Sequence, residues 1–370
     1  MIDFSFFKAR PIGLDIGHSS VKMLQFASKD GQIYVVGGNK IQCKTESSDW
    51  QVRKDFLVSA ITELTNRCGF SGRKVVSCLP NDRIQTGSFR FDVSESDHVD
   101  ALVKSEVSER FGLDPDRDEI DYVTAGKVYQ GEEIKNEVIY FATSRSTIED
   151  HISVLEESGL IPVSIDPIAF ALMRNYRRAM RRQADQEVVK FIVDIGSYST
   201  TVVVGSCQRI SFIKQIPIGG SQLNGQVAKR LNISIEEAAL LRSKMLNGNK
   251  ETIDPSTERS VTDSMNEVIE KLAKEISLCF RYYSVTFRGA RPTEAILSGG
   301  ESYETNLVKA LTRHLGIDVR QSEPLKGIDL TKIEHLIDSS SPLSEWAVAT
   351  GLGIRGWDMV NSEMQANERN

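Results

Sequence analysis

The sequence has few cysteines and no long apolar run. Its five cysteines stand singly, without a Cys-x-x-Cys pair and without a histidine at metal-ligand spacing from any of them. This pattern argues against a disulfide framework or a Cys/His zinc site, so we expect free thiols in a reducing compartment. No stretch reaches the roughly 18 consecutive apolar residues that a membrane helix needs, so we expect no transmembrane span.

Positive charge is not in excess either. The chain has 45 Lys and Arg residues against 51 Asp and Glu residues, a formal net charge of -6. Polyanions are bound by clustered basic residues, so no nucleic-acid partner is expected. The first ten residues place an acid at position 3 and their bases after an apolar cluster, the reverse of a secretory signal. These features predict a cytoplasmic protein.

What the chain does have is length and an ordinary globular composition. Of its 370 residues, 40% are hydrophobic and 26% charged, which is typical of a folded protein. A single hydrophobic core stops growing at roughly 250–300 residues. We therefore expect two or more domains.

One short motif occurs twice. Asp15-Ile16-Gly17 recurs as Asp194-Ile195-Gly196, and Ser20 is matched by Ser199. Each copy ends an apolar strand, at residues 12–16 and 188–195, and precedes small hydroxyl residues and a second strand. An internal duplication of the fold is the simplest explanation.

This arrangement suits phosphate binding. A tight hairpin with a glycine directs backbone N–H groups and hydroxyls at an anion. A strand-end Asp can hold Mg²⁺ through a bound water, because Mg²⁺ prefers oxygen ligands and keeps most of its waters. A single Asp-x-Gly is a routine turn, but two copies at equivalent places favour a clamp that closes on a triphosphate from both sides. Asp15 and Asp194 are then the residues that hold the metal.

A third element follows in the order that such a site needs. Residues 295–297 are predicted as a short strand that runs into Ser298-Gly299-Gly300 and then a helix over residues 305–315. Glycines without a Cβ let a purine or a ribose lie against the backbone. Alone this is equally well an ordinary strand-to-helix turn; after two phosphate hairpins it supports a nucleotide site.

An insertion separates the two copies. Between residues 84 and 165 the pattern predicts a small α+β unit of the β-α-β-β-α-β kind. Its elements are strand 84–91, helix 95–111, strands 118–129 and 134–144, helix 146–158 and strand 161–165. A helix over residues 166–183 follows, and its arginines lie on one face that we expect to be solvated. These are Arg174, Arg177, Arg178, Arg181 and Arg182.

The three motifs resemble the actin/Hsp70/sugar-kinase ATPase superfamily. The first phosphate loop is similar to residues 15–22, the second to residues 194–200 and the adenosine turn to residues 298–300. The insertion resembles the extra subdomain of FtsA and of the PilM family of type IV pilus assembly proteins. The resemblance to the PilM family is the closer one and covers nearly the whole chain. The resemblance implies an α/β, actin-like (ribonuclease H-like) duplicated ATPase fold. Its two lobes would surround a nucleotide cleft, with an FtsA/PilM-type inserted α+β subdomain.

The same resemblance implies four structural parts. The first actin-like lobe would take residues 1–88, 166–186 and 341–365. The inserted subdomain would take residues 89–165. The second lobe would take residues 187–226 and 291–340, and a helical nucleotide-side subdomain residues 227–290.

ATP and Mg²⁺ are the cofactors that the resemblance implies. Asp194 and Asp166 are the catalytic candidates, because the acid that begins the linking helix orients the attacking water in some members. Asp166 stands where Glu is common, and Glu301 follows the glycine pair where a small residue is usual, so we expect at most a slow ATPase. The residues expected to bind the cofactor are Asp15, Gly17, Ser19, Ser20, Lys22, Gly196, Ser197, Ser199, Thr200, Gly219, Gly220, Glu237, Arg242, Ser298, Gly299 and Gly300.

The expected function is that of an ATP-binding scaffold of the type IV pilus inner-membrane assembly platform, or of a related pilus or secretion platform. By resemblance, its partner is the cytoplasmic N-terminal tail of a PilN-like bitopic membrane protein. The tail would lie in a groove between the first lobe and the inserted subdomain and would hold the chain at the inner membrane. A pilus motor ATPase is a second candidate partner.

Three alternatives remain open. An FtsA-like cell-division relative is disfavoured, because residues 357–370 lack the amphipathic membrane helix of FtsA. A small-molecule kinase is disfavoured, because residues 84–165 offer no glycine-flanked Asp at the end of an apolar strand to act as a base. A type II secretion module is disfavoured by the lack of a membrane span.

Overall fold

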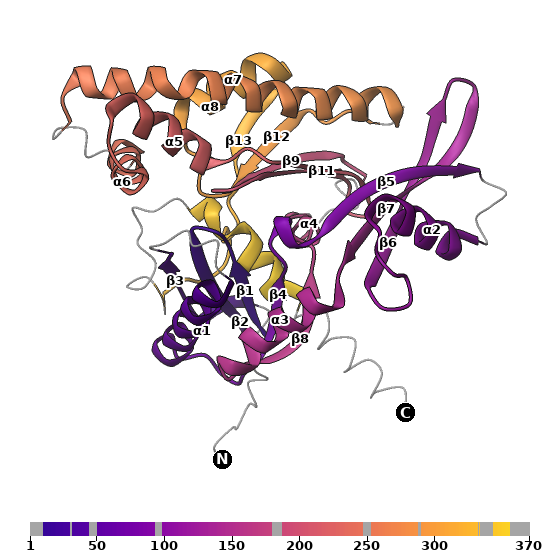
Figure 1. Ribbon diagram of the computed structural model, residues 1–370, viewed down its shortest axis with the longest axis horizontal. Helices are drawn as coiled ribbons and strands as arrows, with labels where there is room; N and C mark the ends of the chain where they lie inside the picture. The colour runs from indigo at the N-terminus through magenta and orange to yellow at the C-terminus, as the bar shows by residue number, and fades with distance from the viewer. Residues whose placement is uncertain are drawn as a thin grey trace.

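The computed structural model describes residues 10–29, 32–43, 50–92, 98–179, 187–246, 253–287, 290–331, 333 and 343–355. Within them the chain forms two lobes and a projecting subdomain (Figure 1). Arg181 and Arg182 of the predicted arginine face and the polar end at 357–370 lie outside the described residues.

Two five-stranded sheets with the same strand order form the centres of the lobes. The first runs β3-β2-β1-β4-β8 and the second β11-β10-β9-β12-β13. In each, the first two strands of the motif pair antiparallel, and the later strands add in parallel. The predicted duplication is confirmed. The strands are β1 (Ile12–Ile16), β2 (Ser20–Lys29), β3 (Gln32–Gln42), β4 (Lys74–Cys78), β8 (Ile161–Asp166), β9 (Lys190–Ile195), β10 (Thr200–Gly205), β11 (Ile210–Ile216), β12 (Glu294–Ser298) and β13 (Asp318–Gln321).

Helices cover both sheets, which explains why the central strands are apolar on both faces. Every residue of β1 and of β10 is buried. On the first sheet, Ile61 and Leu64 of α1 share a core with Leu155 of α3. The covering helices are α1 (Trp50–Arg67) and α3 (Arg145–Glu157) on the first sheet, and α5 (Gly220–Leu231), α6 (Ile235–Leu246), α7 (Pro255–Thr286) and α8 (Thr305–Leu315) in the second lobe.

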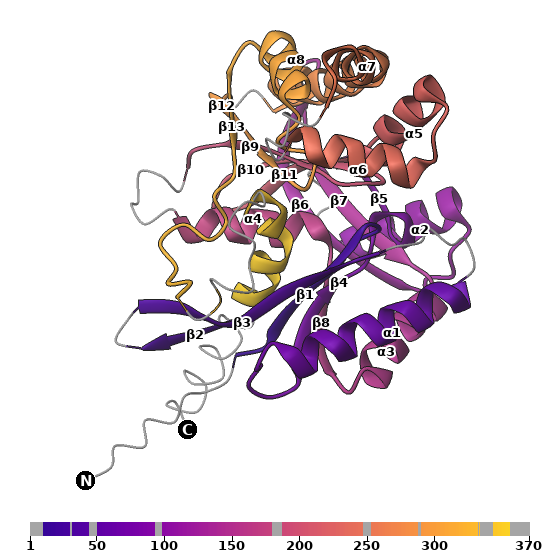
Figure 2. The same cartoon turned by 90° about the vertical axis from the view of Figure 1, so that its left-hand side faces the viewer.

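Two further helices connect the lobes. Helix α4 (Ile168–Ala179) follows the last strand of the first sheet, yet packs against β9 and β10 of the second. The helix over residues 347–355, which begins after the short turn η5 (Leu343–Trp346), packs against the first sheet. Figure 2 shows both helices between the two lobes. Helix α4 therefore follows the first sheet and packs on the second, and the helix over residues 347–355 follows the second sheet and packs on the first.

These two helices approach so closely that only glycine fits. A Cβ on Gly351 would lie 1.9 Å from the carbonyl oxygen of Ala171 in α4. A Cβ on Gly13 in β1 would lie 2.3 Å from the carbonyl oxygen of Ala349. The small residues of the helix over residues 347–355 are therefore required for backbone-to-backbone packing.

The inserted subdomain is smaller than predicted. Strands β5 (Gln85–Asp92), β6 (Glu119–Gln130) and β7 (Glu133–Thr143) form an antiparallel sheet of order β5-β7-β6, and α2 (Val99–Phe111) shares its apolar cluster. The predicted helix and strand at residues 146–165 do form, as α3 and β8. However, β8 pairs in parallel with β4 in the first lobe. Assigning them to the insertion was wrong, because element type follows from local pattern whereas sheet membership depends on long-range pairing.

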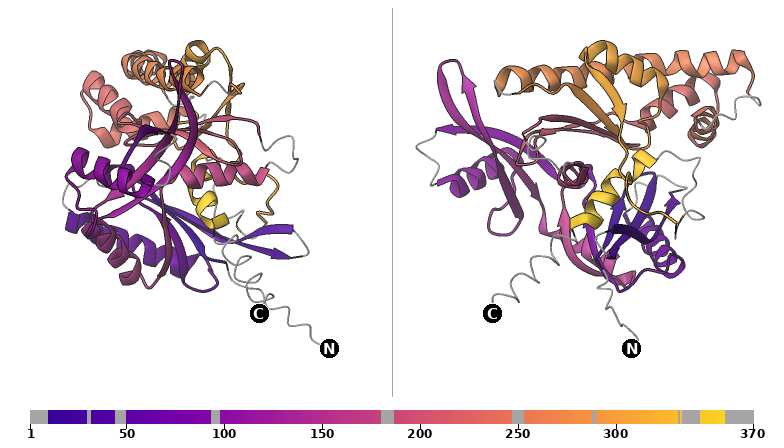
Figure 3. Two further views of the ribbon diagram at one scale, coloured as in Figure 1. Left: turned by 90° about the vertical axis from the view of Figure 1, so that its right-hand side faces the viewer. Right: turned by 180° about the vertical axis from the view of Figure 1, so that it is seen from behind.

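The inserted subdomain also contacts the second lobe. Ala125 and Phe141 join the core that contains Ile210 of β11, and Arg90 donates to the hydroxyl of Tyr282 on α7 at 2.9 Å. Figure 3 shows the subdomain at one end of the molecule, beside this edge of the second lobe. The subdomain is therefore anchored to both lobes.

Replacing Gly351 by Ala tests the close helix crossing. The added methyl has no room against Ala171, so we expect the free energy of unfolding to fall by about 3 kcal/mol. Urea unfolding followed by circular dichroism measures it. The control is Gly225→Ala in α5, where a Cβ meets nothing within 4 Å and should stabilise the helix by about 0.5–1 kcal/mol. Equal stabilities of the two variants would contradict the crossing.

Candidate functional site

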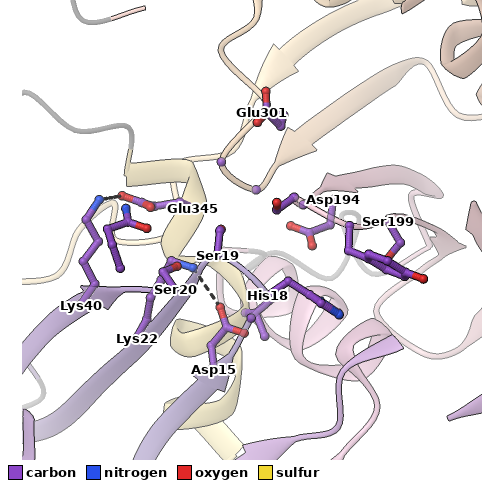
Figure 4. Close-up of a pocket in the computed structure, with 18 of the residues that line it drawn as sticks. Asp15, His18, Ser19, Ser20, Lys22, Lys40, Asp194, Ser199, Glu301 and Glu345 are labelled. Atoms are coloured by element: carbon purple, nitrogen blue, oxygen red, sulfur yellow. Dashed lines mark hydrogen bonds and ion pairs between the residues drawn. The ribbon is translucent and has the colours of Figure 1, made fainter. Parts of the chain in front are cut away.

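A cavity of about 330 Å³ lies between the lobes. Its walls come from the β1–β2 hairpin, the β9–β10 hairpin, α6 and the turn after β12 (Figure 4). It collects most of the residues that the sequence predicts for cofactor binding. Those that line it are Asp15, Gly17, Ser19, Ser20, Lys22, Asp194, Gly196, Ser197, Ser199, Arg242, Gly299 and Gly300.

The two hairpins have the same internal geometry. The N–H of Gly17 donates to the carbonyl oxygen of Ser20 at 3.0 Å, and the N–H of Gly196 donates to that of Ser199 at 3.0 Å. Both turns line the same cavity from opposite lobes. The repeated sequence motif therefore forms two equivalent hairpins that face one cavity, as a clamp around one anion requires.

Charges of both signs meet at the bottom of this cavity. Lys22 Nζ lies 3.3 Å from Asp15 Oδ2. Burial alone would lower the pKa of Lys22, but the carboxylates of Asp15 and Glu345 outweigh it, and the pKa is raised. Burial and the charge of Asp15 together raise the pKa of Asp194 to about 6. A cation between the hairpins would relieve this repulsion between carboxylates.

These donors fit Mg²⁺ and a polyphosphate. Asp15 and Asp194 supply hard oxygen ligands, and Lys22 supplies a cation for phosphate oxygens. Among the described residues no group of three or more His, Cys, Asp or Glu side chains could enclose a metal. A Mg²⁺ held here would therefore keep waters and phosphate oxygens in its shell.

The glycine pair after β12 forms an open cradle on one side. Gly299 has φ +87°, and a Cβ on it would lie 2.3 Å from the carbonyl oxygen of Ile195, so glycine is required at this position. A Cβ on Gly300 would meet no atom within 4 Å. The backbone at Gly300 is therefore free to receive a flat ligand group.

Arg242, an expected cofactor-binding residue, and Glu301, a departure from the superfamily pattern, form one ion pair. Arg242 is buried on α6 and donates to Glu301 at 2.6 Å and to Asn224 at 2.7 Å. Burial alone would lower the pKa of Arg242, but the charge of Glu301 raises it. Their proximity could not be predicted, because α6 and the turn after β12 are distant in sequence.

Several predicted residues support the cavity from outside its lining. Thr200 Oγ1 donates to the carbonyl oxygen of Ile218 at 2.8 Å, which fixes the loop before α5. Glu237 accepts from the N–H of Ser234 at 2.9 Å in a capping box at the start of α6. Gly219, Gly220 and Ser298 are also not among the residues that line the cavity.

Asp166 is buried and does not line the cavity. One carboxylate oxygen accepts from Arg174 at 2.8 Å, and the other forms an ion pair with Arg355. Arg174 also donates to the carbonyl oxygen of Gly351 at 2.8 Å. This geometry favours a structural role at the helix crossing over the predicted orientation of water.

The expectation of a solvated arginine face was wrong for Arg174 and Arg178. Besides the bonds of Arg174, Arg178 donates to the carbonyl oxygens of Pro324 and Lys326, each at 3.0 Å. Both guanidinium groups therefore hold α4 to its surroundings.

Sequence reasoning missed the contacts that connect the hairpin tips. His18 and Tyr198 stack across the cavity, with ring centroids 4.5 Å apart and planes at 14°. Asn81 donates to Ser199 Oγ at 3.1 Å and to Thr201 Oγ1 at 2.8 Å. The place of His18 and Tyr198 inside the repeated motif was a usable signal. Nothing in the sequence marks Asn81.

The repeated sheet order, the facing hairpins and the glycine turn define an actin-like ATPase fold. The family described as "Type IV pilus assembly protein PilM" matches residues 13–357. The chain belongs to this family, which confirms the resemblance found in the sequence. In the described part of the chain, no helix is both long enough and apolar enough to cross a bilayer.

Known structures and relatives agree with this assignment. The chain resembles a structure titled "PilM-PilN type IV pilus biogenesis complex", with TM-score 0.75, 19% identity and coverage of 94% of this chain and 98% of that one. It resembles MreB 5 of Spiroplasma citri bound to AMPPNP, with TM-score 0.53, 12% identity and coverage of 97% and 99%.

FtsA of Streptococcus pneumoniae is similar at the sequence level. The two are 22% identical over 249 residues, which is 60% of this chain and 52% of FtsA. The chain thus spans about half the length of this relative.

The role of Asp166 leads to a prediction about stability. Asp166→Asn removes the buried negative charge that pairs with Arg174 and Arg355, so we expect the free energy of unfolding to fall by about 3 kcal/mol. Urea unfolding measures the loss. An exposed carboxylate on α3, removed in Glu149→Gln, is the control. Unchanged stability together with lost ATP turnover would instead support a role for Asp166 in orienting water.

Proposed function

We propose that this chain is an ATP-binding cytoplasmic scaffold in type IV pilus assembly. The scaffold would hold the N-terminal tail of a PilN-like membrane protein and so be peripheral to the inner membrane. The single observation that carries the nucleotide part is the pair of equivalent hairpins that line one cavity. Membership of the PilM family supports the pilus part.

The site supports holding ATP·Mg²⁺ more than it supports fast hydrolysis. Lys22 and the hairpin N–H groups would bind the phosphates, and Asp15 and Asp194 would hold the Mg²⁺ through water. The metal would neutralise phosphate charge while bound. The acid that would orient water, Asp166, is already engaged with two arginines.

Removing Asp194 tests the clamp. We expect Asp194→Ala to weaken ATP·Mg²⁺ binding by at least about 1.4 kcal/mol, or tenfold, because half of the metal's carboxylate support is lost. Isothermal titration calorimetry measures this. Asp318→Ala removes an exposed carboxylate from the same lobe and is the matched control. Equal affinities of the Asp194 variant and the wild type would refute the clamp.

A second cavity is a candidate binding site for the tail of the partner. It has a volume of about 180 Å³ and lies among α1, α3 and the short helix η1 (Asn81–Arg83). Because η1 joins β4 to β5, and residue 144 joins β7 to α3, this cavity lies beside both connections to the inserted subdomain.

The walls of this cavity suit an extended peptide. Trp50, Leu57 and Val154 offer apolar surface, and Asp82 and Arg83 offer charge. The guanidinium carbon of Arg83 lies 4.6 Å from the centroid of the Trp50 ring. Alternating apolar and polar pockets are what an extended chain uses for side-chain recognition.

A synthetic peptide of the partner's cytoplasmic N-terminus tests this site. We expect it to slow hydrogen exchange in residues 79–85 and 143–154, and Trp50→Ala to weaken it by at least about tenfold, or 1.4 kcal/mol. ATP affinity should stay unchanged in that variant, because Trp50 does not line the nucleotide cavity. Ile235→Ala, on the exposed side of α6, is the control. Protection confined to residues 187–340 would contradict the assignment.

A further inference from the structure

One charged side chain, Glu301, lines the cavity beside the glycine pair after β12. Glu301 leaves the turn after β12 and reaches the start of α5, where a Cβ on Gly220 would lie 2.0 Å from Glu301 Oε1. Figure 4 shows Glu301 on the wall opposite the β1–β2 hairpin, beyond Asp194. The carboxylate therefore lies over Gly220, next to the open backbone of Gly300.

A buried cation holds Glu301 in this position. Arg242 Nη2 lies 2.6 Å from Glu301 Oε2 and 3.5 Å from Glu304 Oε2. The side chain of Arg242 is 4% exposed, so it depends on these carboxylates for compensation. The ion pair connects α6 with the turn after β12 across the end of the cavity.

We propose that the Arg242–Glu301 pair is a gate at the nucleoside end of the cavity. This inference rests on the proposed nucleotide binding. Phosphates would bind at the hairpins, away from this pair. A nucleoside placed between Gly300 and α6 would have to displace the Glu301 carboxylate, because the ion pair with Arg242 joins these two walls of the cavity. Displacement costs Arg242 its nearest counterion, so the gate weakens binding of ATP while leaving binding of a bare polyphosphate unchanged.

The test compares a ligand that has a nucleoside with one that has only the phosphates. Calorimetric titrations use ATP·Mg²⁺ and inorganic tripolyphosphate·Mg²⁺, which has the phosphates without the nucleoside. Glu301→Gly should tighten ATP binding by about tenfold, the equivalent of about 1.4 kcal/mol, and leave tripolyphosphate affinity unaltered. Glu301→Gln, which keeps the bulk and weakens the ion pair, should tighten ATP binding less.

Glu304→Gln is the matched control. Glu304 contacts the same guanidinium but does not line the cavity, so this variant should bind both ligands as the wild type does. Thermal melting checks that each variant is folded. If Glu301→Gly does not fold, Glu301→Gln carries the test, and ATP affinity equal to that of the wild type would then refute the gate.

The remaining outcomes are distinct. Weaker or equal ATP binding by Glu301→Gly, with tripolyphosphate binding intact, overturns the gate and makes Glu301 a ligand of the nucleoside or a bystander. If neither ligand binds the wild type or any variant, the proposed nucleotide function fails, and the gate fails with it. Tighter ATP binding by the Glu304 variant as well would show that loosening Arg242, rather than freeing space, is what matters, and would also overturn the proposal.

Discussion

The close contact between α4 and the helix over residues 347–355 determines how the rest of the molecule is arranged. Each helix follows the last strand of one sheet and packs on the other sheet, and Gly351 meets Ala171 backbone to backbone. This contact sets the separation of the two sheets, and the sheets carry the two hairpins. The cavity between the hairpins therefore depends on the contact between Gly351 and Ala171, where even one added methyl group does not fit.

The same crossing uses the carboxylate of Asp166, which sequence reasoning assigned to catalysis. Asp166 pairs with Arg174 and Arg355, and Arg174 also reaches the carbonyl oxygen of Gly351. Asp15, Lys22 and Asp194 remain in the cavity, and their charges suit the phosphate and metal of the proposed ligand. This division of charges agrees with the proposal that the site holds a nucleotide more than it hydrolyses one.

The fold was largely predictable because its strongest signal is local. Asp-x-Gly at the end of an apolar strand, followed by a second strand, is visible in each half without knowledge of the other, and both hairpins formed at the predicted residues. The membership of α3 and β8 was not predictable, because an apolar strand pairs equally well with any free edge of matching register. Likewise, Arg242 and Glu301 lie 59 residues apart, and nothing near either residue in the sequence indicates that they form a pair.

The sequence by itself determined the duplicated sheets, the hairpins and the glycine turn, since strand alternation, turn residues and glycine requirements act over a few neighbouring residues. Only the tertiary structure decided which acids face the cavity and which are used in assembly. Asp15, Asp166 and Asp194 all stand in or at the end of apolar strands, yet Asp166 alone meets two arginines, one from each of the two crossing helices. The function of a carboxylate depends on the charges that lie near it, and distant parts of the chain supply those charges.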